Sequence, residues 1–135
     1  MNLYRSLFID RLPDGSLFNI LERLASEGYL QNNRRLNVEF DCSQSSRFVE
    51  LICSMKNLES LDLNEHDLNP DVLARVFQSC SKLVEMDIAI QKYKTHEMAE
   101  HLKDQLRSGF KKLRRLDLVF SIDDDTWLVI QEMLT

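Results

Sequence analysis

The sequence predicts an α/β protein of about five successive strand–helix units, with a parallel sheet on a concave face. Three observations predict this fold class. An apolar pattern recurs at a step of 25 residues. Each copy of the pattern contains the apolar stripe of a helix, and each helix is followed by the alternating pattern of a short strand. We therefore expect residues 1–135 to form a single repeat domain.

The 25-residue step is seen most clearly in the middle of the chain. Seven apolar residues between Phe48 and Leu63 return 25 positions later as seven apolar residues between Leu73 and Ile88. The first four of each set are spaced by three, one and three residues, as on one side of an amphipathic helix. The last two are spaced by two residues, as on one face of a strand. Each unit is therefore predicted to consist of a helix, a tight ascent and a short strand.

The same unit extends towards both ends of the chain. Strand patterns begin at positions 7, 36, 61, 86 and 116, at intervals of 29, 25, 25 and 30 residues. Upstream, the helical stripe is predicted to consist of Leu17, Ile20, Leu21 and Leu24, which share the spacing of the central helices.

Turn-forming residues set the expected helix boundaries. Asn69 followed by Pro70 predicts an N-cap with proline in the first turn. Thr95 is the expected N-cap of a longer fourth helix, and Gly109 is expected to follow its end. The acidic run 123–125 is expected at the positive end of the last helix.

The segments LESLDL, LVEMDI and LRRLDL resemble the core motif of leucine-rich repeat proteins. Units of 25 to 30 residues with a full helix are similar to the ribonuclease-inhibitor-like and F-box-associated subclasses of that family. The stretch LPDGSLFNILERL, residues 12–24, is similar to the opening helix of an F-box, although it also fits the helix of the first unit. The resemblance implies a repeat solenoid that binds a protein partner.

Composition and charge argue against several classes of function. The chain of 135 residues has a net charge of −5, with 17 basic and 22 acidic residues, so general affinity for nucleic acid is not expected. We find neither an apolar run of membrane-spanning length nor the pattern of a secretory signal. Three widely spaced cysteines predict free thiols and a cytoplasmic or nuclear location.

Motifs for catalysis and metal binding are missing from the sequence. There is no phosphate loop, dinucleotide fingerprint or glycine-flanked serine, so we predict that the protein is not an enzyme and uses no cofactor. His96 and His101 are five residues apart, about 140° around a helix, which does not suit a shared metal. The KKLRR segment at 111–115 fits a solvated edge better than a nucleic-acid patch.

The predicted binding site lies on the sheet, because residues that alternate with the buried strand leucines face outward. The middle outward residues of the five strands are expected to form a column with three adjacent aspartates that repel one another. Such an acidic track suits a protein partner with a basic or donor-rich surface. The predicted partner-binding residues are Phe8, Asp10, Arg35, Asn37, Glu39, Asp62, Asn64, Glu85, Asp87, Arg115, Asp117 and Val119.

The sequence thus predicts a protein-interaction module, and the family resemblance implies substrate recognition within an F-box-type ubiquitin ligase. The alternative function is stoichiometric inhibition or regulation of an enzyme, in the manner of ribonuclease inhibitor. Because no separate cap is evident near Met1 or Thr135, we also expect flanking repeats, or an end buried against a partner or a second copy.

Overall fold

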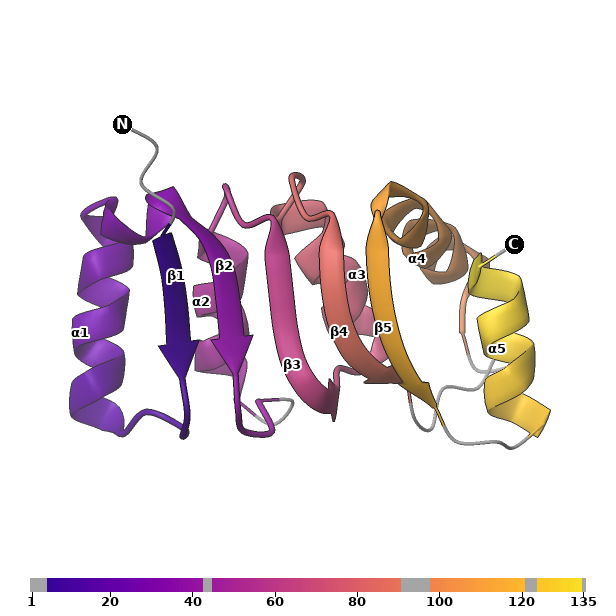
Figure 1. Cartoon of the computed structure of the whole chain (residues 1–135), viewed down its shortest axis with the longest axis horizontal. Coiled ribbons are helices and arrows are strands. Elements are labelled where there is room, and N and C mark those ends of the chain that lie inside the picture. Colours follow the sequence, from indigo (N-terminus) through magenta and orange to yellow (C-terminus); the bar gives the residue numbers. More distant parts are fainter. Residues whose placement is uncertain (1–4, 43–44, 91–97, 121–123, 135) are drawn as a thin grey trace.

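The computed structural model describes residues 5–42, 45–90, 98–120 and 124–134, in which strands and helices alternate along the chain (Figure 1). The elements are β1 (Arg5–Ile9), α1 (Gly15–Ser26), the 3-10 helix η1 (Tyr29–Asn32), β2 (Asn33–Val38), α2 (Ser46–Ser54), β3 (Ser60–Asp67), α3 (Pro70–Ser79), β4 (Glu85–Ile90), α4 (Glu100–Lys112), β5 (Arg115–Phe120) and α5 (Asp124–Leu134).

The five strands form one parallel sheet in the order β1-β2-β3-β4-β5, so each strand pairs with its neighbours along the chain. The five predicted strand positions align in register across this sheet, in the order Leu7, Leu36, Leu61, Met86 and Leu116. The predicted α/β class, with alternating strands and helices around a parallel sheet, is confirmed.

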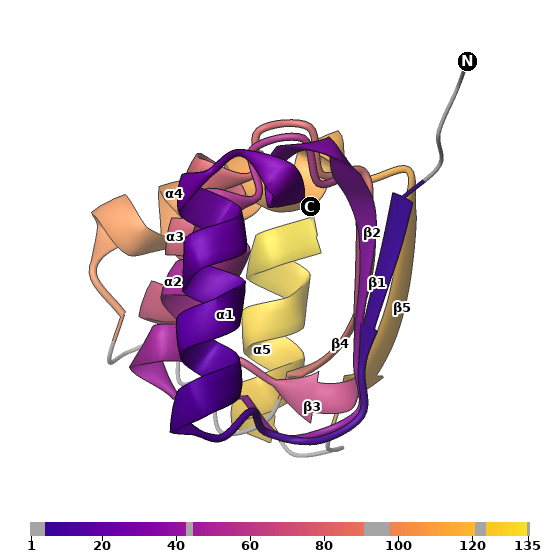
Figure 2. The same ribbon diagram turned by 90° about the vertical axis from the view of Figure 1, so that its left-hand side faces the viewer.

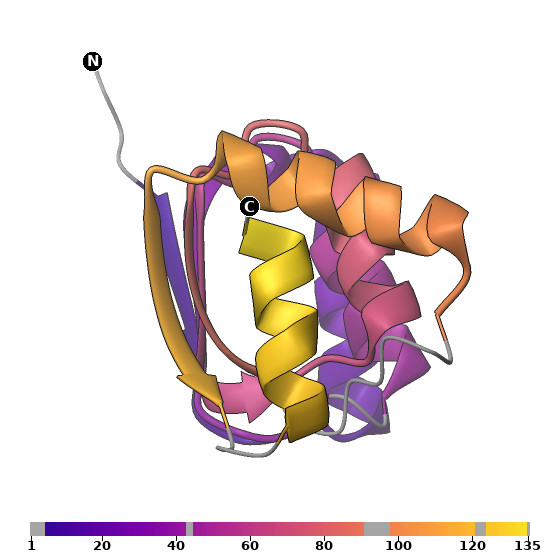
Figure 3. The same ribbon diagram turned by 90° about the vertical axis from the view of Figure 1, so that its right-hand side faces the viewer.

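The helices lie on one side of the sheet, whereas the opposite side carries no helix among the described residues (Figure 2). We call this second side the open face. Helix α1 lies at one end of the molecule and α5 at the other (Figure 1). Viewed from its own end of the molecule, α5 lies between the sheet and the layer of the other helices (Figure 3). Strand-to-helix packing thus leaves one face of the sheet for other contacts.

The core lies between the sheet and the helices, and it is built from the repeating pattern. All fourteen residues of the two seven-residue sets are buried, from Phe48 to Leu63 and from Leu73 to Ile88. Edge-to-face contacts join the rings of neighbouring units, with Phe77 and Phe110 centroids 5.2 Å apart. Periodicity therefore identified the core of the central units correctly.

The first helix is rotated relative to the prediction. Leu17 and Ile20, expected in its buried stripe, are 41% and 55% exposed, whereas Phe18 and Leu21 are buried. The Phe18 ring packs edge-on against Phe48 of α2, with centroids 6.4 Å apart. Because α1 lies at the end of the helix layer, it has a helix neighbour on one side only, and its large ring turns towards that neighbour.

Two of the predicted helix boundaries differ from the structure. Asn69 caps α3 as expected, with its side chain accepting from the Val72 amide at 2.9 Å and Pro70 in the first turn. Helix α4, however, begins at Glu100 after Ala99, and Thr95 lies outside the described residues. Gly109 lies inside α4 rather than after it, because a close approach to α3 requires glycine there.

The last helix begins in the acidic run, as expected. Asp124 and Asp125 lie in its first turn, whereas Asp123 is outside the described residues.

Candidate binding face of the sheet

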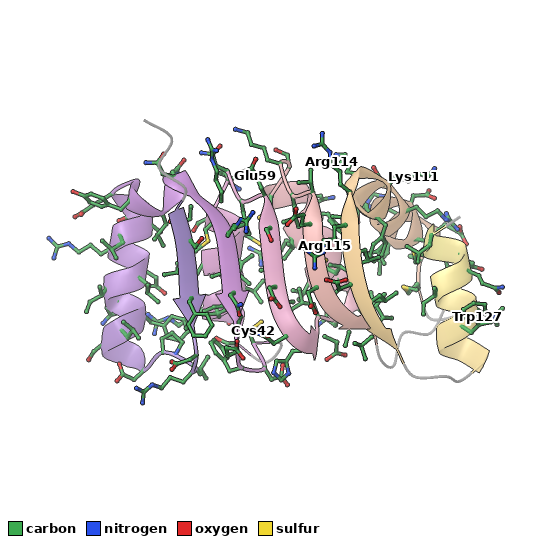
Figure 4. The ribbon with its side chains drawn as sticks, in the orientation of Figure 1. Cys42, Glu59, Lys111, Arg114, Arg115 and Trp127 are labelled. Carbon is green, nitrogen blue, oxygen red and sulfur yellow. The ribbon has the colours of Figure 1, made fainter. Side chains whose placement is uncertain are left out.

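The predicted column of outward residues exists and is in register. Phe8 pairs with Asn37, Asn37 with Asp62, Asp62 with Asp87, and Asp87 with Asp117, so five strands each contribute one member. A second column runs beside it through Ser6, Arg35, Ser60, Glu85 and Arg115. Because the strands are parallel and the step is regular, residues as far apart in sequence as Phe8 and Asp117 share one column. Figure 4 looks onto this face, with Arg115 labelled on β5.

Two adjoining hollows lie over these columns. One, of about 290 Å³, extends over β1, β2 and β3, and the other, of about 220 Å³, extends over β2, β3, β4 and β5. Arg35, Ser60 and Asp62 line both, so the two hollows share part of their walls. The wall of the second hollow includes Asp62, Glu85, Asp87, Asp117, Arg35 and Arg115. Four carboxylates against two guanidinium groups leave this part of the open face acidic.

Asp62 is held by polar contacts within the protein. Its Oδ1 accepts a hydrogen bond from the Asn64 backbone amide at 2.9 Å, and its Oδ2 accepts from Asn37 Nδ2 at 3.4 Å. Asn64 in turn donates through Nδ2 to Asn37 Oδ1 at 2.7 Å and to the Val38 carbonyl at 2.9 Å. These bonds join β2 to β3 and orient the Asp62 carboxylate towards its own sheet.

The negative charge of Asp117 also has a partner within the protein, but at the surface. Arg115, two residues earlier on the same face of β5, donates to Asp117 Oδ2 at 3.1 Å. Both side chains are exposed. Two members of the predicted aspartate column thus have partners within the protein: Asp62 accepts hydrogen bonds from amides, and Asp117 forms an ion pair with a guanidinium group.

The remaining predicted site residues take different places. Phe8 is 59% exposed at one edge of the open face and Val119 is 39% exposed near the other. Asp10 and Glu39 are exposed after the ends of β1 and β2 and do not line either hollow. Asn64 acts as an internal brace, since it is half-buried and uses its side chain to join two strands.

One outward position of the predicted pattern is not available on this face. Ala89, expected to alternate outward on β4, is fully buried. The register between β3 and β4 shifts between Asp62 and Asp67, and Asp67 pairs with Ala89. The extra residues of β3 in this irregular stretch break the simple alternation.

A third hollow, which sequence reasoning missed, lies between α3 and α4. It has a volume of about 370 Å³ and is lined by Phe77, Gln78, His101, Asp104, Gln105, Ser108, Gly109 and Lys112. Gly109 was the available signal, because glycine inside a helix often marks a close approach of two elements. His96, the other histidine of the rejected metal motif, lies outside the described residues.

The cysteines are packed as small apolar side chains. Cys42, Cys53 and Cys80 are all buried and unpaired, as predicted. Burial, helped by the neighbouring Asp41, raises the pKa of Cys42 to about 11. Burial raises the pKa of Cys80 to about 12, and its thiol points to the Ile52 carbonyl at 3.5 Å. Their high pKa values keep the Cys42 and Cys80 thiols protonated and poorly nucleophilic.

A search of the described parts of the chain finds no group of three or more His, Cys, Asp and Glu side chains arranged to hold a metal ion. Within the same residues, none of the helices combines the length and the apolar character of a membrane span.

No protein-family model matches the sequence. No curated protein matches it either. Among solved structures, the chain is similar to the tropomodulin C-terminal domain from Caenorhabditis elegans, with a TM-score of 0.54 and 16% sequence identity. The match covers 97% of this chain and 82% of that domain.

These comparisons correct the subclass implied by the sequence resemblance. Assignment to the ribonuclease-inhibitor-like or F-box-associated subclass is wrong: the structural similarity is to the tropomodulin C-terminal domain, and neither a family model nor a curated protein supports those subclasses. The chain has a mixed α/β architecture consistent with a leucine-rich-repeat-like fold, shared with the tropomodulin C-terminal domain.

Proposed function

We propose that this chain is a non-catalytic protein-interaction module, a repeat solenoid whose open face is concave and binds a protein partner. The partner presents a basic or donor-rich surface to the acidic part of that face. Specificity and association rate, more than raw affinity, are expected to come from this charge complementarity.

One observation carries the proposal: side chains from all five strands meet in register on a face of the sheet that none of the described helices covers. The register places Asp62, Asp87 and Asp117 side by side on adjacent strands, with Glu85 beside Asp87 on β4. The resulting hollow is shallow and polar, with carboxylates and guanidinium groups along its wall. Such a surface suits contact with another polypeptide rather than enclosure of a small apolar ligand, which needs a deeper and less polar pocket.

The test is selection of binders from a displayed peptide library on the wild-type protein, followed by measurement on two charge-matched variants. The open-face variant carries Glu85→Lys, Asp87→Lys and Asp117→Lys. The control variant carries Glu27→Lys, Asp71→Lys and Asp104→Lys, all at exposed helix-side positions. Among the described residues, the ion pairs of Glu27 and Asp104 are made within their own helical segments, with Arg23 and Arg107.

We expect the selected binders to carry net positive charge and to lose at least about tenfold in affinity for the open-face variant, a loss of about 1.4 kcal/mol. The control variant should bind them nearly as well as the wild type. The proposal would be overturned by binders that keep their affinity for the open-face variant and lose it for the control. Circular dichroism of both variants checks that each remains folded.

A further inference from the structure

The open face is chemically polarised along the order of its strands. At β1 it presents Phe8, which at 59% is the most exposed large hydrophobic side chain of the described residues. Phe8 lines the hollow that extends over β1, β2 and β3. An apolar ring that stands exposed at the edge of a hollow is an anchor point for an apolar partner side chain.

Acidic groups are concentrated three strands away. Glu85 and Asp87 lie on the same face of β4, and Asp62 and Asp117 flank Asp87 on the adjacent strands. A cation above β4 is thus within reach of carboxylates from three strands. A guanidinium group suits this position particularly well because its donors match carboxylate oxygens in pairs.

The distance between Phe8 on β1 and the acidic groups on β4 sets the spacing of the two partner side chains that would contact them. Adjacent strands are about 4.8 Å apart, so β1 and β4 are separated by about 14 Å across the sheet. An extended peptide advances about 3.3 Å per residue and therefore covers that separation in about four residues. Side chains four residues apart on an extended chain also point to the same side. One apolar and one basic side chain could then face the sheet together.

Polar groups lie along the path between the two places. Arg35, Ser60 and Asp62 line both hollows, on β2 and β3. They offer donors and acceptors to the backbone of a chain that crosses the strands.

We propose that the partner binds through an extended segment that crosses the strands, with an apolar side chain over Phe8 and a basic side chain, preferably Arg, four residues away over β4. This proposal rests on the proposed function of the open face and names the partner chemistry that the face selects. The spacing of the two side chains, rather than their presence alone, determines affinity.

The experiment uses labelled synthetic peptides in a Ser/Gln background, each with one Phe and one Arg. The two residues are separated by two, three, four or six positions, in both chain orders, and binding to the full chain is measured by fluorescence anisotropy. Comparison with peptides that lack the Phe or the Arg gives the gain in affinity, or benefit, that each side chain contributes. We expect the four-residue separation to bind about tenfold more tightly than the others in at least one chain order.

Protein variants then assign each peptide side chain to its place. Phe8→Ala should abolish the benefit of the peptide Phe, and Asp87→Asn should reduce the benefit of the peptide Arg. Tyr29→Ala and Asp104→Asn are the matched controls, since Tyr29 is 58% exposed on η1 and Asp104 is exposed on α4. Neither control should change the spacing preference.

The outcomes separate this inference from the function on which it rests. Equal affinity at every spacing, with binding still lost in the open-face variant, overturns the inference and leaves the binding face intact. Peptide binding that survives the open-face variant overturns both. If no designed peptide binds measurably, the inference is wrong, and the displayed-library experiment decides the function independently.

Discussion

Gly109 of α4 lies directly against the ring of Phe77 on α3, and this contact joins the two helices. A Cβ added at position 109 would stand 2.7 Å from Phe77 Cε2 and still closer to Cδ2 and Cγ. Phe77 is buried and packs edge-on against Phe110, so a shift of its ring would disturb this contact.

We therefore predict that Gly109→Ala lowers the free energy of unfolding by about 1–3 kcal/mol, as overpacking of a core contact does. Urea denaturation measures this change in the free energy of unfolding. Gly15→Ala is the matched control, because nothing lies within 4 Å of a Cβ there, and it should be neutral or slightly stabilising. Adding Phe77→Leu to Gly109→Ala should recover part of the loss. Equal stability of Gly109→Ala and Gly15→Ala would contradict the contact.

Asn64 combines an unusual backbone angle with a bracing side chain. Its φ is 48°, and it is the one non-glycine residue of the described chain with positive φ. We predict that Asn64→Ala is destabilising both through the left-handed backbone and through loss of the bonds to Asn37 and Val38. Asn64→Gly loses only the bonds, so it should be more stable than Asn64→Ala by about 1 kcal/mol. Thermal unfolding of the two variants gives this difference, and an Ala variant at least as stable as Gly would refute it.

Asp62 and Asp117 should respond differently to substitution although they share a column. Asp62 accepts one hydrogen bond from Asn37 of β2 and one from the Asn64 amide within β3, whereas Asp117 has an exposed ion pair. We predict that Asp117→Lys changes the free energy of unfolding by no more than about 0.5 kcal/mol. Asp62→Lys should cost clearly more, about 1–3 kcal/mol, because the Asn64 amide loses its acceptor. Chemical denaturation of the two single variants is the measurement, and equal losses would show that the brace contributes little.

The buried thiols predict a loss of stability at alkaline pH. Cys42 has a pKa of about 11 in the folded chain, above its ordinary value of 9.0. Between these values the unfolded chain has lost the proton that the folded chain retains, so rising pH favours unfolding. The contribution of the protonated Cys42 thiol to the free energy of unfolding is complete below about pH 9 and is lost as the pH rises towards about 11. The free energy of unfolding falls by at most about 1.4 kcal/mol per pH unit in this range.

Urea denaturation at about pH 8 and about pH 10.5 tests this in the wild type and in Cys42→Ala. The variant should lose less stability between the two conditions than the wild type. An identical loss in both would show that Cys42 keeps its ordinary pKa.

Thiol labelling provides a separate prediction. All three cysteines are buried and unpaired, so iodoacetamide at neutral pH should modify them slowly in the native protein and completely in urea. Mass spectrometry of the intact chain counts the modified residues. Rapid labelling without denaturant, or a disulfide in the purified protein, would be inconsistent with the packing of Cys42, Cys53 and Cys80.

The sequence was most informative where the same apolar pattern recurs in several successive units. Leu36, Leu61 and Met86 occupy the same position in successive units, so each unit supports the assignment of the others. The predicted strand register was therefore correct. The column on the open face was predicted for the same reason, since outward positions follow once the inward ones are known.

Prediction failed where a residue's place depends on a neighbour in space. Leu17 and Phe18 are adjacent apolar residues on α1, and only the ring of Phe48 decides which one turns inward. Gly109 resembled a helix end because the sequence does not show that Phe77 lies against it. The internal bonding of Asp62 was missed because it depends on the left-handed turn at Asn64.

The strand order has a consequence for how the protein opens. Among the described residues, each strand pairs only with its chain neighbours, and β1 and β5 have one paired neighbour each. In such a linear arrangement, local unfolding starts most easily at the two edges, so amide protons of β1 and β5 should exchange with solvent sooner than those of β3. Phe8 and Asp117 lie on these two edge strands. A ligand that contacts both would therefore hold shut the two segments that otherwise open first, and slower exchange at both edges would report its binding even where no strand changes position.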